Sequence, residues 1–278
     1  MNRSQVAVSA HLVWLLYNPA RSSKGVDLIK QIARSTSLDR IIVVWNGKGL
    51  PPLDTTSLKS LGRIVELLEG SNCGREFGGY QEGLDHLQRQ ATGGVYFLND
   101  TAGVHNYLPQ YFVHAMVSAA LRCGGGKGVC VGHVDRALQM LEINGLTSDF
   151  WIRSNLFYLD SVALESLKWK VYSPEIDALV PGDLPDRFYA VTLSSPMQER
   201  INRWMFQPGK KSWYGAATLT RENVDFMAGK VRSILQEYYF TMRVSRANVQ
   251  VSRTDMNMLQ LLWFKLINRI GRITGYLK

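Results

Sequence analysis

The sequence predicts an α/β fold with a mixed, mainly parallel sheet flanked by helices. Short apolar runs that end in polar turn residues alternate with stretches of helical periodicity. The runs predict strands at His11–Tyr17, Arg40–Trp45, 64–68 and 95–98. With 278 residues, 46% of them apolar, the chain is long enough for one large domain with a small appendage.

Each of these runs is short, and a turn closes it. The first two end in Asn18-Pro19 and Asn46-Gly47, with a predicted helix over 25–34 between them. The third leads into a glycine-rich turn, and the fourth ends in Asn99-Asp100-Thr101. Because parallel strands end at the same edge of a sheet, we expect these turns to meet at one edge, where α/β proteins bind their ligands.

The rest of the chain predicts more helices and at least two more strands. Helices are expected over 80–90, 109–122, 161–169, 221–243 and 256–270, and strands over 129–131 and 150–159. Residues 173–196 are rich in Pro, Asp and Ser and predict a loop or an acceptor-side lid. We therefore expect a main domain over 1–220 and a C-terminal helical extension over 221–278.

The charge favours an anionic partner. The net charge of +9 and the pI of about 9.5 suit a nucleotide, a nucleic acid or an acidic membrane surface. The three cysteines form no CxxC pair, which favours a reducing compartment. No window has the ~20 uncharged apolar residues that span a bilayer. We expect a cytoplasmic protein, or one on the inner face of the membrane.

The motifs at the strand ends resemble a known family when they are taken in order. These motifs are Tyr17-Asn18, Trp45-Asn46-Gly47, the turn NCGREFGGYQEG over 72–83, and Phe97-Leu98-Asn99-Asp100-Thr101. The order resembles the nucleotide-binding half of family 2 glycosyltransferases of the GT-A fold, and is similar to rhamnan-synthesis enzymes of bacterial surface polysaccharides. The resemblance covers about 10–104 and implies an acceptor half over 105–220.

This resemblance implies a site for the diphosphate of a nucleotide sugar. A helix N-terminus and the Arg75 guanidinium would meet the negative charge, and glycines would let the backbone approach it. The implied donor-binding residues are Asn18, Asn46, Gly47, Asn72, Gly74, Arg75, Gly78, Gly79, Asn99 and Asp100. The alternative is a tight turn whose glycines serve only the packing of strand against helix.

Asp100 is the acid that the resemblance makes most informative. In the family this position helps to hold Mg²⁺ or Mn²⁺ on the donor diphosphate, and carboxylate oxygens suit both ions. The sequence has Asn99-Asp100-Thr101-Ala102 in place of the usual D-x-D, so only one acid is present and metal dependence stays open. His105 is a second candidate contact. The alternative for Asp100 is a strand-end cap.

A general base would deprotonate the acceptor hydroxyl if the reaction inverts the anomeric centre. The sequence offers Asp149, just before a predicted strand, and Glu199, which lies near Arg200 and Arg203. The family favours a late base, hence Glu199. A residue of either kind is more often a plain surface or salt-bridged acid.

The C-terminal segment has a different character. Residues 256–270 place apolar side chains on one helical face and basic residues near its polar side, and basic residues exceed acidic ones from Arg243 onward. A helix of this kind lies on an anionic membrane surface or packs on the core or a second subunit. The charge favours a membrane contact over 255–272.

The first hypothesis on function is a glycosyltransferase that moves a sugar from a nucleoside diphosphate sugar to a polysaccharide or lipid-linked glycan in bacterial surface glycan synthesis. A basic nucleic-acid-binding protein would explain the charge but not the ordered motifs. A catalytically reduced GT-A-like partner subunit is compatible with the single-acid motif.

Overall fold

In the computed structural model, the chain folds around one seven-stranded sheet. The structure describes residues 10–47, 56–87, 93–104, 107–122, 126–182, 185–209, 215–253 and 258–274. The strands are β1 (Ala10–Leu16), β2 (Leu38–Trp45), β3 (Gly62–Glu69), β4 (Val95–Asn99), β5 (Val129–Ile143), β6 (Leu146–Leu159) and β7 (Gln250–Arg253). The helices are α1 (Ser22–Ala33), α2 (Thr56–Lys59), α3 (Arg75–His86), α4 (Gln110–Arg122), α5 (Ser161–Ser166), α6 (Pro174–Asp177), α7 (Ser195–Ile201), α8 (Val224–Arg246) and α9 (Met258–Ile273).

Strand pairing makes this sheet mixed but mainly parallel. The order is β3-β2-β1-β4-β6-β5-β7. Strands β3, β2, β1 and β4 pair in parallel, and β6 pairs antiparallel with both β4 and β5. Since β7 pairs parallel with β5, only β6 of these seven strands runs in the opposite direction. The carboxyl ends of β1 to β4 therefore lie along one edge.

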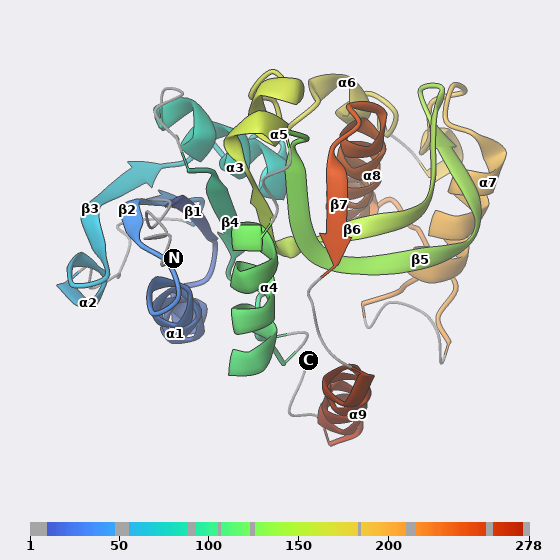
Figure 1. Ribbon diagram of the computed structural model, residues 1–278. Helices are drawn as coiled ribbons and strands as arrows, with labels where there is room; N and C mark the ends of the chain where they lie inside the picture. Colours follow the sequence, from blue (N-terminus) through green and yellow to red (C-terminus); the bar gives the residue numbers. More distant parts are fainter. Residues whose placement is uncertain are drawn as a thin grey trace.

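Helices cover both faces of the sheet (Figure 1). On one face, side chains of β1, β2 and β4 pack with α1 and α4, and Trp14, Tyr96 and Phe112 are fully buried there. On the other face, alternate residues of the same strands pack with α3, α5 and α8 around Phe77, Tyr80 and Phe157. The strands are buried on both faces, which explains why they appear in the sequence as continuous apolar runs.

A third apolar cluster lies beyond the sheet proper. The β5–β6 hairpin contributes Leu141 and Ile143, and α6, α7, a following π-turn at Asn202–Phe206 and the first half of α8 cover it. Helix α8 therefore belongs to both the second and the third cluster. The division into 1–220 and 221–278 stays a prediction.

The predicted GT-A-like (Rossmann-like) α/β fold with a mixed, mainly parallel sheet and a C-terminal helix is confirmed. Several elements differ from the expectation. Strand β5 continues to Ile143, α3 begins at Arg75 before the predicted helix start, and the predicted loop over 173–196 contains α6 and the start of α7. Strand β7 was not predicted, because four residues at a sheet edge carry little periodicity.

Candidate functional site

Asp100 ties the carboxyl ends of β4 and β1 together. Its Oδ2 accepts hydrogen bonds from the backbone N–H groups of Tyr17 at 3.1 Å and Asn18 at 2.7 Å. The carboxylate is 2% exposed, and the Arg21 guanidinium lies 3.8 Å from its Oδ1. Burial raises the pKa of Asp100, and these hydrogen bonds and Arg21 offset the effect only in part. Burying a carboxylate destabilises the fold unless the carboxylate is hydrogen-bonded, so the two N–H donors and Arg21 stabilise Asp100 in this position.

The Tyr17 phenol joins three of the strand-end loops. Asn46 Nδ2, from the end of β2, donates to Tyr17 Oη at 3.4 Å. Burial is the largest cause of the raised pKa of Tyr17. The charges of Glu76 and Asp100 raise this pKa further, whereas the hydrogen bond from Asn46 and the charge of Arg75 lower it. The charges of Arg75, Glu76 and Asp100 thus all act on this one hydroxyl. We call Tyr17, Asn46, Arg75, Glu76 and Asp100 the edge cluster.

Two acceptor atoms of the edge cluster are buried without a hydrogen-bond partner in the described part of the chain. They are Asn46 Oδ1 and Glu76 Oε2. Asn46 is 8% exposed and sits against Gly70 and Gly79, where no larger residue would fit. Because buried acceptors are nearly always paired, these two unpaired atoms are exceptions that a donor N–H or O–H group would satisfy.

The backbone before α3 is strongly bent. Asn72, Gly74 and Arg75 all have positive φ angles, of 58°, 69° and 51°. Glycine tolerates such an angle at little cost, whereas Asn and Arg adopt it rarely. The N–H groups in the first turn of an α-helix have no acceptor within the helix, so the N-terminus of α3 carries a partial positive charge. Arg75 and Glu76 of the edge cluster lie in this first turn.

Gly78 and Gly79 do not line an open loop. An added Cβ on Gly78 would lie 1.7 Å from the Cys73 carbonyl oxygen, and one on Gly79 would lie 2.5 Å from Leu15 Cδ1. Gly83, one turn later, approaches Val13 in the same way. Gly79 and Gly83 bring α3 close to β1, and Gly78 lets the preceding turn lie against the helix. This is the packing role that the sequence left as the alternative, and the donor-binding role of Gly78 and Gly79 stays a prediction.

The Arg75 side chain crosses from α3 to α8. An added Cβ on Gly229 would lie 1.8 Å from Arg75 Nη2 and 2.3 Å from its Cζ, so the guanidinium rests directly on that glycine. A glycine in the middle of an α-helix is otherwise destabilising, and here it makes room for the cation. The Arg75 charge is thereby held against α8.

The remaining predicted donor residues flank the edge cluster. Asn18 is exposed, and its Oδ1 accepts from Ala20 N at 3.0 Å. Gly47 lies against the Trp45 ring, and Asn72 is exposed. Asn99 Oδ1 accepts from both the N–H and the hydroxyl of Thr101, so Asn99 shapes the turn after Asp100.

The two predicted bases lie on other elements. Asp149 is an exposed residue of β6 near the hairpin turn, five residues before Ser154, and therefore about 17 Å along the strand from it. Glu199 is 68% exposed on α7 and pairs with Arg203 one turn on. Among the described residues, neither forms a hydrogen bond or ion pair with the edge cluster, and their roles stay predictions.

Glu237 is an acid that sequence reasoning missed. It comes from α8, and its Oε1 accepts from the Ser154 N–H of β6. The last β4–β6 pair is Leu98 with Leu156, so Ser154 and Asp100 each lie two residues beyond it. Burial raises the pKa of Glu237 to about 7 against the hydrogen bonds from Ser154. The signal in the sequence that could have indicated Glu237 is an acid among the mostly apolar and aromatic residues of 235–240.

The described residues do not build a metal site of their own. They contain no group of three or more His, Cys, Asp or Glu side chains that would hold an ion. Oδ2 of Asp100 is engaged by two N–H groups, and a cationic side chain faces Oδ1. The divalent-ion prediction therefore rests on Asp100 alone, and the proposed contact His105 lies outside the described residues.

Comparisons with known proteins add little to this geometry. No family model matches the sequence, and no curated protein does. Among solved structures, the chain is similar to 4-diphosphocytidyl-2C-methyl-D-erythritol synthase, with a TM-score of 0.37 and 10% identity over 60% of this chain and 82% of that one. It is also similar to an inositol-1-phosphate CTP transferase from T. maritima, with a TM-score of 0.36 and 10% identity over 95% and 97%. At these values neither likeness bears on the function of this chain.

Proposed function

We propose that this protein is a glycosyltransferase that moves a sugar from a nucleoside diphosphate sugar to a polysaccharide or lipid-linked glycan in bacterial surface glycan synthesis. The observation that carries the proposal is the convergence of β1, β2, β4 and α3 on Tyr17. There, two buried acceptors without partners, a helix N-terminus and two guanidinium groups surround one edge of the sheet.

In this proposal the two unpartnered acceptors recognise the nucleoside. Asn46 Oδ1 and Glu76 Oε2 accept hydrogen bonds from N–H or O–H groups of the base and ribose. The Tyr17 phenol stays neutral at physiological pH because its pKa is raised, and so it remains a hydrogen-bond donor. Asn18 and Gly47 border the same space from the ends of β1 and β2.

The diphosphate lies at the positive end of α3, with Arg75 and Arg21 as its cations. Arg75 is held on Gly229, and Arg21 is one-third exposed beside Asp100. Fixed cations and helix N–H groups stabilise the charge that develops on the departing nucleoside diphosphate. A divalent ion on Asp100 would supply additional positive charge to the same phosphates.

Glu237 is the base that best suits the acceptor side of this site. Its hydrogen-bond partner Ser154 lies on β6, the strand next to β4, and a carboxyl with a pKa near 7 suits proton removal from a hydroxyl at neutral pH. Glu199 and Asp149 stay alternative candidates. Their separate substitution by amides distinguishes the three.

A thermal-shift screen of UDP, GDP, dTDP and CMP, each with and without Mn²⁺, tests donor binding. A nucleotide at one hundred times its Kd stabilises the folded state by about 2.7 kcal/mol, so the melting temperature rises by several degrees. One nucleotide should give this shift. The Asn46→Ala variant should reduce it, whereas Asn144→Ala, in the distant hairpin turn, should not. No shift with any nucleotide at millimolar concentration would contradict the proposal.

Turnover assays with the matching sugar nucleotide then test the base. Glu237→Gln should abolish sugar transfer and keep the nucleotide shift, because the amide preserves shape but accepts no proton. Glu199→Gln and Asp149→Asn serve as matched controls. Loss of transfer in either control, with activity retained in Glu237→Gln, would assign the base to that residue.

The acceptor side of the proposal extends to location. A lipid-linked acceptor would bring the protein to the inner face of the membrane as a peripheral protein, and the charge of +9 favours an anionic surface. None of the described helices combines the length and the hydropathy needed to cross a bilayer.

A further inference from the structure

Helix α9 has one docked face and one outward face. Phe264 is 4% exposed and stacks on Phe112 of α4 with ring centroids 5.2 Å apart, and His133 of β5 lies 5.5 Å from it. Asn268 Oδ1 accepts from Tyr107 N at 2.7 Å, and its Nδ2 donates to Tyr107 O at 3.2 Å. Phe264 and Asn268, one turn apart, thus fix the rotation of α9 about its axis.

That rotation leaves a large apolar stripe pointing away from the protein. Its members recur at three- and four-residue spacing and are between 46% and 78% exposed: Leu259, Leu262, Trp263, Leu266, Ile270 and Ile273. Exposed apolar side chains scattered singly need no explanation, but a contiguous stripe along a helix marks a contact surface. In Figure 1, α9 lies apart from the helices that cover the sheet.

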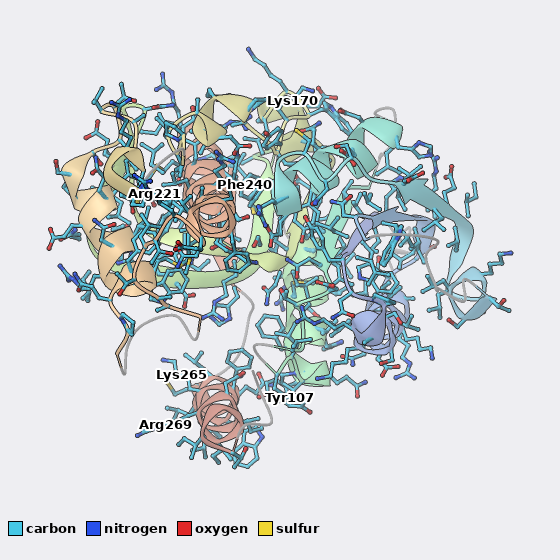
Figure 2. All side chains as sticks on the ribbon, turned by 180° about the vertical axis from the view of Figure 1, so that it is seen from behind. Tyr107, Lys170, Arg221, Phe240, Lys265 and Arg269 are labelled. Carbon is cyan, nitrogen blue, oxygen red and sulfur yellow. The ribbon has the colours of Figure 1, made fainter. Side chains whose placement is uncertain are left out.

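Positive charge borders this stripe. Lys265 and Arg269 are exposed and project on the side of α9 away from Tyr107 (Figure 2). The sequence has no Asp or Glu from 256 to 278. A second copy of this helix would bring like charges together, whereas the headgroups of an anionic bilayer complement them. Trp263, within the stripe, is a side chain favoured at the boundary of headgroups and acyl chains.

We propose that α9 lies in the plane of an anionic lipid bilayer, with the Leu259–Ile273 stripe buried among the acyl chains and Lys265 and Arg269 at the headgroups. The partner of the apolar stripe is a lipid surface, and this contact needs no nucleotide. It stands independently of the proposed reaction, and binding to vesicles can be measured when sugar transfer is absent.

The docked face of α9 is tied to the segment that follows β4. Tyr107, which both hydrogen bonds of Asn268 engage, follows Asp100 by only seven residues.

Vesicle flotation with the full chain tests the proposal. Vesicles of phosphatidylcholine with 30% phosphatidylglycerol, roughly the anionic content of a natural leaflet, are compared with pure phosphatidylcholine. Leu266→Glu should lower partitioning to the anionic vesicles at least tenfold, since an acid in the acyl region is costly. Lys265→Gln and Arg269→Gln should each lower it about fivefold, with little change on pure phosphatidylcholine.

Leu138→Glu is the matched control, because Leu138 is fully exposed on the β5–β6 hairpin. It should float like the unchanged protein, and circular dichroism should show all variants folded. Equal flotation of Leu266→Glu and the unchanged protein overturns the proposal, as does equal binding to both vesicle types. A dimer in light scattering that Leu266→Glu dissociates would assign the stripe to a second copy and overturn it as well.

Discussion

Asp100 has a structural task whether or not it also contacts a donor. Its Oδ2 accepts the N–H groups of Tyr17 and Asn18, and a buried N–H without an acceptor destabilises a protein by about 1–3 kcal/mol. Asp100→Ala should therefore lower the free energy of unfolding by at least that amount, and Asp100→Asn by less because one amide oxygen remains. Urea unfolding at pH 7 measures both. Equal losses in the two variants would contradict this bonding.

Glu237 should make stability depend on pH in a window that ordinary carboxyl groups do not reach. The folded protein raises its pKa from 4.5 to about 7, so the folded state holds the proton more tightly than the unfolded chain does. The resulting stabilisation is present in full below pH 4.5 and is lost as the pH rises through 7. It amounts to at most about 3 kcal/mol.

Glu237→Gln should remove this dependence, because an amide does not titrate. Between pH 5 and pH 8, urea unfolding should show the unchanged protein losing stability relative to the variant. Arg153 and Asp135 are the charged groups nearest to the carboxyl, and Asp135 is already ionised throughout this range since its pKa is held well below the usual value. Parallel pH profiles for the two proteins would contradict the assignment.

At the scale of single residues, the sequence could predict those candidate site residues that directly follow a strand. Asn46 and Asp100 follow apolar runs, and strand-end positions in a parallel sheet meet by geometry. Tyr17 and Glu237 were missed as site residues because their importance comes from neighbours far away in the chain, such as the Ser154 N–H that Glu237 accepts. No local spacing encodes such a contact.

At the scale of elements, one glycine of α3 and one glycine of α8 should respond to substitution by alanine in opposite ways. Gly83 of α3 faces Val13 of β1, where an added Cβ would lie 2.4 Å from Val13 Cγ1 in a close-packed interior. Gly83→Ala should lower the free energy of unfolding by about 1–3 kcal/mol through overpacking. Urea unfolding checks this, with Asp85→Ala on the exposed side of α3 as the control.

Gly229→Ala should behave in the opposite way. The added methyl group meets only the end of the flexible Arg75 side chain, so the guanidinium moves while the helix gains up to about 1 kcal/mol from alanine's propensity. Stability should hold or rise, and the nucleotide-dependent thermal shift should fall because a cation is displaced from the site. An unchanged nucleotide shift would argue that Arg75 does not touch the ligand.

The elements that the sequence predicted well are those that are buried on both sides. Strands β1, β2 and β4 are continuous apolar runs because helices cover both faces of the sheet. The outer part of β5 escaped prediction because Leu138, Gln139 and Met140 face solvent in a hairpin beyond the core. Gly79 packs helix on strand, and the expected contact of Gly78 and Gly79 with a ligand stays a prediction, because sequence spacing does not separate those two uses.

At the scale of the whole molecule, α9 is a separate unit held by a few contacts. Phe264→Ala removes the ring that stacks on Phe112, and the cost to global unfolding is limited because α9 can detach while the sheet stays folded. Hydrogen exchange measured by mass spectrometry should accelerate on the order of tenfold in 258–273 and stay unchanged in α8. Equal acceleration in both helices would show that α9 is integral to the core.

The amphipathic character of α9 was visible in the sequence, but its orientation was not. Apolar residues lie nearly all round this helix, and nothing local marks Phe264 as docked and Trp263 as outward. The choice follows from the stacking on Phe112 and from the two hydrogen bonds between Asn268 and Tyr107. Only the assembled chain brings residues 107 and 268 together.

The carboxylate that joins β4 to β1 has a consequence for how related sequences should be compared. A descendant that had lost its chemistry would still need an acceptor for those backbone groups, and it would keep the aspartate as a fastener of its sheet. Its presence in another chain is thus a poor marker of an active enzyme. Glu76 and Arg75 do not join two strands, so substitutions at these two positions would be a better sign that the activity has been lost.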